Sequence, residues 1–336
     1  MNDAILFLLT LLLTLGGTVV ISRRLIPLLK SKKMGQKILD IGPRWHKSKE
    51  GTPTMGGVAF IAACLIAALG AVIAALAGDR FSDIVPYLTV LLYALLNGLI
   101  GVIDDSAKLR KKQNEGLTPP QKFFLQLVAA ALFLVLLYVE GEITTSLVIP
   151  FVGISLELGF WYYIVALLLL TGMVNAVNLT DGIDGLASGV TLAVGGFFAV
   201  AAFFAGIVEA TSLSLVSAAM IGSSLGFLVY NFYPARVFMG DTGSLFLGGM
   251  VVGGAFLTGS PLIALIAGII YISETASVIL QVGYFKLTHG KRLFRMAPIH
   301  HHFEKCGWSE VKIVTVFTVI TVLFCVLAWF GLTLPG

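Results

Sequence analysis

Long runs of apolar residues, separated by short polar segments, dominate the chain. A helix needs about 20 apolar residues to cross the hydrocarbon of a bilayer. Ten runs meet that length: 4–22, 54–77, 84–103, 121–139, 160–178, 186–207, 213–231, 243–259, 262–284 and 311–332. The pattern therefore predicts an all-α polytopic membrane protein with about ten transmembrane helices in a single domain, 1–336.

One polar segment differs from the others in its pattern. Residues 143–158 alternate apolar and polar positions around a Pro-Phe-Val-Gly turn. Such alternation across a turn is typical of two paired strands. We predict a small external β-hairpin here, whose simplest role is to cover one end of the bundle.

Composition supports the membrane class. The chain is 57% hydrophobic and 12% charged, whereas soluble domains carry roughly 25% charged residues. The first apolar run is followed by "SRRLIPLLKSKK" and not by a small-residue cleavage site, so we expect it to be a retained span. Three widely separated cysteines argue against a disulfide framework or a cysteine-based zinc site.

Charge predicts the orientation. An even number of spans places both termini on one side, and of the 22 Lys and Arg residues all but Arg80 fall on the other side. The positive-inside rule makes the basic side cytoplasmic and both termini external. The cytoplasmic segments, which we expect to build a catalytic face, are 23–53, 104–120, 179–185, 232–242 and 285–310.

Two adjacent carboxylates, Asp104 and Asp105, end the third run in "NGLIGVIDDSAKLRKK". Neighbours on a helix point about 100° apart, so the two cannot do the same job. Lys108 and Lys112 follow Asp104 at i+4 and i+8, close to one helix face. A solvated helix end with ordinary ion pairs is the alternative interpretation.

The segment "NAVNLTDGIDG" joins the fifth and sixth runs and carries polar residues at every third position: Asn175, Asn178, Asp181 and Asp184. Gly182 and Gly185 interrupt helical spacing, so we expect the helix to end near residues 180–181. The amides then lie on its last turn and the carboxylates on the loop. An Asp-Gly turn is the alternative, although amides inside an apolar run are costly without partners.

A third polar segment, "YNFYPARVFMGDTGSL", places Asn231 at the end of one run and Asp241 at the start of the next. Asp241 could simply cap that helix, but Gly240 and Gly243 would also let a phosphate approach backbone N–H groups. Carboxylates gathered with Lys, Arg and His on one face fit a magnesium-bound polyphosphate, because Mg²⁺ prefers oxygen ligands.

Three consecutive histidines stand in "RMAPIHHHFEKCGW". On a helix they would spread over about 200° and could not all face one ion, and no cysteine or fourth histidine is placed to complete a zinc site. Arg292 and Arg295 favour an anion nearby. We interpret the run as a substrate clamp on a cytoplasmic loop entered through Pro298; a plain solvated loop is the alternative. Glu274, inside the ninth run, is a functional candidate without an assigned role.

Five motifs together resemble a known family: "GTPTMGG" (51–57), "GVIDDSAK" (101–108), "NAVNLTDGIDGLA" (175–187), "VFMGDTGSL" (237–245) and "APIHHHFE" (297–304). They are similar, in this order, to the bacterial phospho-N-acetylmuramoyl-pentapeptide-transferases. The resemblance implies Mg²⁺-dependent transfer from UDP-MurNAc-pentapeptide to undecaprenyl phosphate, giving lipid I and UMP. It also implies ten spans and a homodimer in the bilayer, with no nucleic acid as partner.

The resemblance assigns roles to individual residues. It implies catalytic roles for Asp104, Asp105, Asp241 and His300, with Asp241 as the magnesium ligand. It implies substrate contacts for Lys49, Thr54, Lys108, Lys112, Asn178, Asp181, Asp184, Asn231, Phe238, Gln281, His301 and His302. One residue of the Asp104–Asp105 pair would deprotonate or position the acceptor phosphate.

Other functions remain open at this point. A sister transferase that moves GlcNAc-1-phosphate would share the aspartates, but we expect it to lack the "PIHHHFE" segment. A transporter would place its polar sites near the membrane middle, often in repeated halves, whereas here they lie at helix ends without a convincing repeat. For the mechanism we prefer direct attack by the lipid phosphate over a phospho-aspartate intermediate, because adjacent charges and Mg²⁺ can stabilise the reaction without a covalent step.

Overall fold

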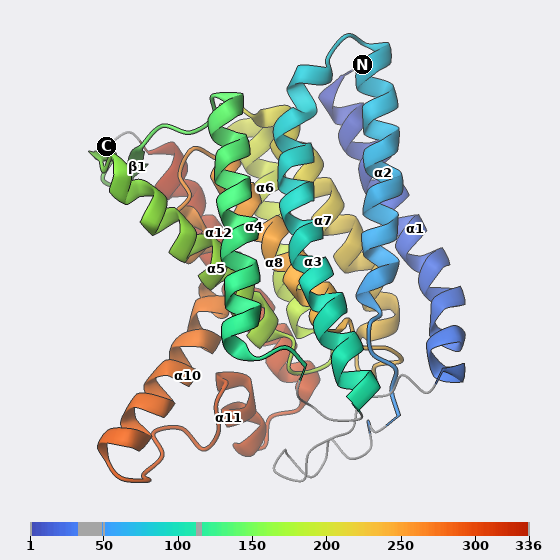
Figure 1. Ribbon diagram of the computed structural model, residues 1–336, viewed down its shortest axis with the longest axis vertical. Coiled ribbons are helices and arrows are strands. Elements are labelled where there is room, and N and C mark those ends of the chain that lie inside the picture. The colour runs from blue at the N-terminus through green and yellow to red at the C-terminus, as the bar shows by residue number, and fades with distance from the viewer. Residues whose placement is uncertain (1, 33–48, 50, 112–115, 335–336) are drawn as a thin grey trace.

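The computed structural model describes residues 2–32, 49, 51–111 and 116–334 (Figure 1). Its helices are α1 (Asp3–Ser31), α2 (Gly57–Ala77), α3 (Val85–Lys111), α4 (Pro119–Glu140), α5 (Phe160–Thr180), α6 (Leu186–Phe204), α7 (Ala210–Asn231), α8 (Gly240–Leu257), α9 (Ile263–Ala267), α10 (Ile269–Leu287), α11 (Ile299–Lys305) and α12 (Glu310–Thr333). A short 3-10 turn, Phe81–Ile84, precedes α3.

Nine helices within the described ranges are long and apolar enough to cross a membrane. They correspond to nine of the ten predicted spans. The prediction of one continuous span over 262–284 was wrong, because the chain breaks at Gly268 into the five-residue α9 and the separate α10. A Cβ at Gly268 would lie 2.6 Å from the Ala264 carbonyl oxygen. The turn therefore needs a residue without a side chain, and α10 leaves the bundle at an angle (Figure 1).

The predicted hairpin is confirmed. Strands β1 (Ser146–Val148) and β2 (Ser155–Glu157) pair antiparallel, with Leu147 opposite Leu156. The hairpin lies against the last turns of α12, where a Cβ at Gly331 would be 3.1 Å from the Pro150 side chain. Figure 1 shows both termini in the same half of the molecule as the hairpin.

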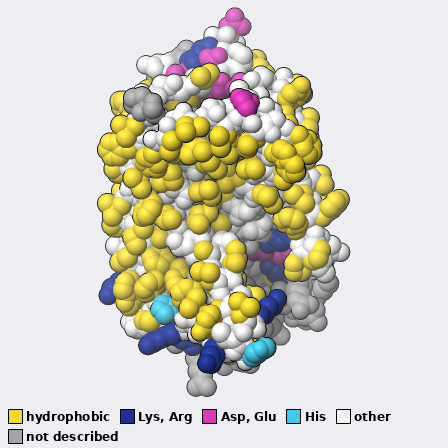
Figure 2. All heavy atoms as spheres, turned by 90° about the vertical axis from the view of Figure 1, so that its left-hand side faces the viewer, with side chains coloured by type: hydrophobic (Ala, Val, Ile, Leu, Met, Phe, Trp, Pro, Cys, Tyr) yellow, Lys and Arg dark blue, Asp and Glu magenta, His cyan; other side chains and the backbone are white. Residues whose placement is uncertain are grey.

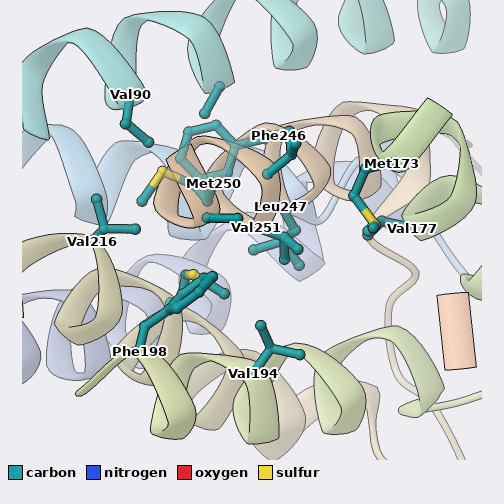
Figure 3. Close-up of a cluster of buried hydrophobic side chains, with 14 of the residues drawn as sticks. Val90, Met173, Val177, Val194, Phe198, Val216, Phe246, Leu247, Met250 and Val251 are labelled. Atoms are coloured by element: carbon teal, nitrogen blue, oxygen red, sulfur yellow. The ribbon is translucent and has the colours of Figure 1, made fainter. Parts of the chain in front are cut away.

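Helix α8 runs through the middle of the bundle, and every residue from Thr242 to Leu257 is buried. Its side chains interlock with those of α3, α5, α6 and α7 in the cluster shown in Figure 3. Gly248 and Gly249 let two neighbours approach closely, since a Cβ on either would come within 3 Å of the backbone of α5 or α3. Small residues allow this packing in a bilayer, where helices gain little by hiding from apolar lipid. The first residues of α8 are thereby held from several sides.

The surface separates apolar from charged side chains. Figure 2 shows a broad apolar belt, with acidic side chains at the upper end and most of the visible Lys, Arg and His side chains near the lower end. In the lower half, basic and acidic side chains are visible together inside a recess of this face. The opposite ends of the bundle therefore differ in charge, as the sequence predicted.

Candidate active site

Three carboxylates meet at the start of α8. Oxygen atoms of Asp104, Asp105 and Asp241 all lie within 4.8 Å of one another. Asp104 and Asp105 belong to α3, and they reach Asp241 because α3 crosses α8 at Gly101. A Cβ at Gly101 would lie only 2.2 Å from the Asp241 carbonyl oxygen. The two helix backbones thus touch one turn away from the carboxylates.

Asp104 and Asp105 have different partners, as their helical positions predicted. Asp105 accepts the backbone N–H groups of Asp241 (3.2 Å) and Thr242 (2.9 Å) and the Thr242 hydroxyl (2.8 Å). It therefore caps α8 from a neighbouring helix. Asp104 pairs with Lys108 at 2.7 Å and accepts the Leu117 N–H at 2.7 Å. Both carboxylates are buried, which contradicts the alternative of a solvated helix end.

Cationic and amide donors surround Asp241. Lys108 and Lys122 place their ammonium groups 2.9 and 3.0 Å from Oδ2, and the Asn178 amide donates to Oδ1 at 2.9 Å. The same amide donates to the Ser244 hydroxyl at 2.8 Å. Sequence reasoning predicted Lys108 and Asn178 but not Lys122. The only available signal for Lys122 was its place in the first turn of the following helix, on the same side of the bundle.

This cluster could hold a metal ion. Its donors are carboxylate oxygens, the ligands preferred by hard divalent cations. Two of the three hydrogen bonds that Asp105 accepts come from the backbone of α8, whereas Asp241 is contacted by the side chains of Lys108, Lys122 and Asn178, which can move aside for a cation. The two lysines that now neutralise Asp241 would be released toward other anions when a cation takes their place.

A second charged cluster is centred on Lys49. Its ammonium group lies 2.7 Å from Asp184 and 2.6 Å from Glu310. Glu310 also accepts the Asp184 backbone N–H at 3.1 Å, and Asp184 accepts the Ala235 N–H at 2.8 Å. These contacts join the loop after α5, the loop before α8 and the start of α12. Glu310 was missed because a Glu in the first turn of a helix has an ordinary explanation.

Asn231, Thr54 and Phe238 lie between these two clusters. The Asn231 side chain accepts the Gly185 N–H at 3.1 Å and donates to the Val237 carbonyl at 3.0 Å. The Phe238 N–H donates to the Pro53 carbonyl at 2.8 Å. A Cβ at Gly240, where φ is +70°, would meet both the Thr54 hydroxyl and Asp105 within 3 Å. Predicted substrate residues therefore line the approach to α8.

The histidines lie on helix α11 and not on a loop, so that part of the prediction was wrong. The helix starts directly after Pro298, which is its N-cap residue and has an extended backbone conformation. The three rings diverge as helical geometry predicted. His300 contacts Glu274 (3.0 Å), His301 contacts Glu304 (2.6 Å) and His302 accepts the Arg295 N–H (3.1 Å).

Gln281 belongs to the same region, since its side chain accepts the Phe294 N–H at 2.8 Å. His300 connects this region to the loop after α5. A Cβ at Gly182 would lie 2.2 Å from His300 Nε2. The structure thus brings His300 against the loop of Asp181 and Asp184, while Lys112 lies outside the described residues.

This contact predicts a large difference between two glycines. Gly182→Ala must displace either the His300 ring or the loop, so we expect turnover to fall about 10-fold or more. Gly172→Ala is the matched control, because a Cβ there meets no atom within 4 Å. Steady-state rates of both variants, compared at equal folded concentration, test this. Equal rates would contradict the close packing of His300 on the loop.

Asp181 is partly buried at the end of α5. Burial raises the pKa of Asp181 well above the ordinary value. The negative charges of Asp241, Asp105 and Asp184 raise it further. Ionising this group costs more in the folded than in the unfolded protein, so its contribution to stability declines as pH rises from the ordinary aspartate pKa of about 4 through the raised value.

Asp181→Asn should consequently raise the thermal midpoint at pH 8, because the neutral amide avoids that electrostatic cost. The gain should shrink as pH falls toward 4, where Asp181 itself is protonated. Thermal unfolding of both proteins in detergent across this range measures the difference. A gain that is the same at every pH would contradict the raised pKa.

Comparison with known proteins shows to which family this chain belongs. The profile described as Glycosyl transferase family 4 matches residues 87–260, and a phospho-N-acetylmuramoyl-pentapeptide-transferase signature matches residues 49–61. A phospho-N-acetylmuramoyl-pentapeptide-transferase of Clostridium perfringens is 47% identical over 309 residues, covering 92% of this chain and 91% of the relative. The chain belongs to this transferase family. Relatives of the same name from Clostridioides difficile and Shouchella clausii are 44% and 43% identical, over 94% and 95% of this chain and 93% and 95% of their own lengths.

Membership makes this phospho-N-acetylmuramoyl-pentapeptide-transferase homologue a multi-pass membrane enzyme of peptidoglycan synthesis. The matched signature covers Lys49 and Thr54. The broader profile spans both α3 aspartates and the start of α8. Family membership and the carboxylate cluster thus point to the same end of the bundle.

Proposed function

We propose that this enzyme transfers phospho-MurNAc-pentapeptide from UDP-MurNAc-pentapeptide to undecaprenyl phosphate. The observation that carries the proposal is the gathering of Asp104, Asp105, Asp241, Lys108 and Lys122 at one end of an apolar bundle. A phosphate on a lipid tail reaches this level from the bilayer, and a nucleotide reaches it from water. We place this end at the cytoplasmic face, in keeping with the basic loops.

Mg²⁺ is the metal we assign to the carboxylates, with Asp241 as its ligand. When bound, Mg²⁺ would neutralise negative charge on the diphosphate. Its preference for carboxylate and phosphate oxygens fits the donors present. Asp241 also lies in the first turn of α8, where the positive helix end favours anions.

The proposed reaction is a direct displacement at phosphorus, supported by the charged side chains at the start of α8. An oxygen of the lipid phosphate attacks the phosphorus that carries the MurNAc sugar. The bond from that phosphorus to the UMP phosphate oxygen breaks, its electron pair leaves with UMP, and a new diphosphate, lipid I, results. The attacking phosphate is already largely ionised near pH 7, so positioning by Asp104 or Asp105 and neutralisation by Lys108 suffice without a covalent aspartyl intermediate.

The remaining predicted residues are assigned to substrate binding. Lys49, Asp184 and Asn231 fix the loops beside α8, and their hydrogen-bonding groups would contact the nucleotide. Further contacts are proposed for Thr54, Lys112, Asn178, Asp181, Phe238, Gln281, His301 and His302. His300, buried against the loop after α5, is proposed to act in catalysis. We also propose a homodimer in the bilayer, as the family resemblance implies.

The decisive measurement is UMP release by purified enzyme given undecaprenyl phosphate and either UDP-MurNAc-pentapeptide or UDP-GlcNAc. We expect turnover with the first nucleotide, dependent on added Mg²⁺ and on the lipid. Turnover with UDP-GlcNAc alone would replace the proposal with the sister GlcNAc-1-phosphate transferase. Trapping a phosphorylated Asp104 or Asp105 with the nucleotide and no lipid would replace direct attack with the two-step route.

A further inference from the structure

We propose that Glu274 is a positioning residue that fixes the imidazole of His300, with Nδ1 protonated and Nε2 facing the loop of residues 181–185. The inference rests on the proposed function, because it assigns a task to a residue beside the transferase site. Sequence patterns left Glu274 without a role. Its contacts in the fold supply one.

The two side chains form a buried pair. Glu274 is fully buried and His300 is 1% exposed. Glu274 Oε2 lies 3.0 Å from His300 Nδ1 and 3.4 Å from the His300 backbone N–H. Glu274 stands on α10 and His300 on α11, so the pair fastens the histidine helix to the helix that leaves the bundle.

An ionised carboxylate can only accept hydrogen bonds. Glu274 therefore requires the hydrogen to be on Nδ1, and the state of the other nitrogen is set by that contact. A carboxylate this deep in an apolar helix is costly without a task or a partner. An amide or hydroxyl side chain could donate as well as accept, so it would not require the ring hydrogen to be on Nδ1.

The other side of the ring faces the transferase site. His300 Nε2 is buried and has no hydrogen-bond partner among the described residues. It lies against Gly182, whose missing Cβ would sit 2.2 Å away. Nε2 is thus held at the loop that carries Asp181 and Asp184. A ring turned by 180° would exchange Nε2 with Cε1, both of which lie beside Gly182, and would separate Glu274 from its donor.

The experiment compares Glu274→Leu, Glu274→Gln and Glu274→Asp with His300→Ala and the double variant Glu274→Leu/His300→Ala. Glu157→Gln, on the exposed strand β2, is the control. We expect Glu274→Leu to lower turnover by about 10- to 100-fold, as removal of a partner that orients a functional histidine does elsewhere. Glu274→Gln and Glu274→Asp should lose less. The double variant should be no slower than His300→Ala alone.

A spectroscopic measurement separates positioning from a structural role. ¹⁵N spectra of protein with labelled histidine, assigned by comparison with His300→Ala, should show the Nδ1-protonated form in wild type and a changed signal in Glu274→Gln. Additive losses in the double variant, or a His300 signal unchanged in folded Glu274→Gln, would overturn the proposal. A wild-type protein without transferase activity would instead overturn the proposed function, while the ¹⁵N result would still decide whether Glu274 fixes the ring.

Discussion

Asp241→Asn should lower Mg²⁺-dependent UMP release about 1,000-fold or more, the effect expected when a central electrostatic group is lost. Asparagine keeps the shape of the side chain and removes its charge. Lys108 and Lys122 then lose the carboxylate that holds them 2.9 and 3.0 Å away. Two charges that are proposed to position the substrate are then displaced together with the proposed metal ligand.

The control for this variant is Asp79→Asn. Asp79 is exposed at the opposite end of the bundle and has a φ of +55°, which asparagine tolerates. Both variants should elute from size-exclusion chromatography like the wild type. Initial rates over a Mg²⁺ titration measure the effect. Activity of Asp241→Asn within about 10-fold of wild type would remove Asp241 as the essential metal ligand.

Gly101→Ala should lower turnover by about 100-fold without any change in the charged residues, since a misplacement near 1 Å can have that effect. A Cβ at this position would lie 2.2 Å from the Asp241 carbonyl oxygen and 2.5 Å from the Thr242 nitrogen. The close atoms are backbone, so no rotamer change relieves the overlap. The start of α8 must move away from α3, and Asp105 must lose its short contacts to Asp241 and Thr242.

Gly98→Ala is the matched control on the same helix. Its nearest neighbours would be the flexible end of Ile61 and the Phe246 Cβ, both at 3.3 Å. We expect a small change in rate there. Initial rates and thermal midpoints of the two variants should be measured together. If Gly101→Ala retained wild-type turnover, the approach of α3 to α8 would not set the geometry of the carboxylates.

The site contains several charged groups that form ion pairs with one another. Asp241 relies on Lys108 and Lys122, and Lys49 is shared by Asp184 and Glu310. Removing one partner of such an ion pair leaves the other charge without its counter-charge. This destabilises the folded protein more than replacing both partners does. Single substitutions in these pairs should therefore affect stability as well as rate, and thermal midpoints belong beside every kinetic comparison.

Several elements of the site could be predicted because the sequence carries short-range signals. Apolar runs of spanning length located nine helices, and glycines after Asn178 placed the end of α5. Helical geometry predicted that Asp104 and Asp105 would diverge. Their partners confirm this, since one caps α8 and the other pairs with Lys108.

Other features had no local signal. The break at Gly268 lies in a run as apolar as its neighbours, and only the direction of α10 in the bundle reveals it (Figure 1). The sequence interpretation places the three histidines on a loop between two spans, whereas they form part of the short helix α11. Lys122 and Glu310 each have an ordinary role at a helix end. Their meeting with Asp241 and Lys49 depends on which helices pack together.

By itself the sequence determined the class of the protein, most of its spans, the gathering of polar residues at one end of the bundle, and the family resemblance. These follow from composition, apolar run length and motifs, which are properties of neighbouring residues. The tertiary structure alone decided that α3 touches α8 at Gly101, that Asp105 caps α8, and that Glu274 holds His300 against Gly182. Such contacts join positions far apart in the chain, and they arise only when small residues let particular helices pack closely in the bilayer.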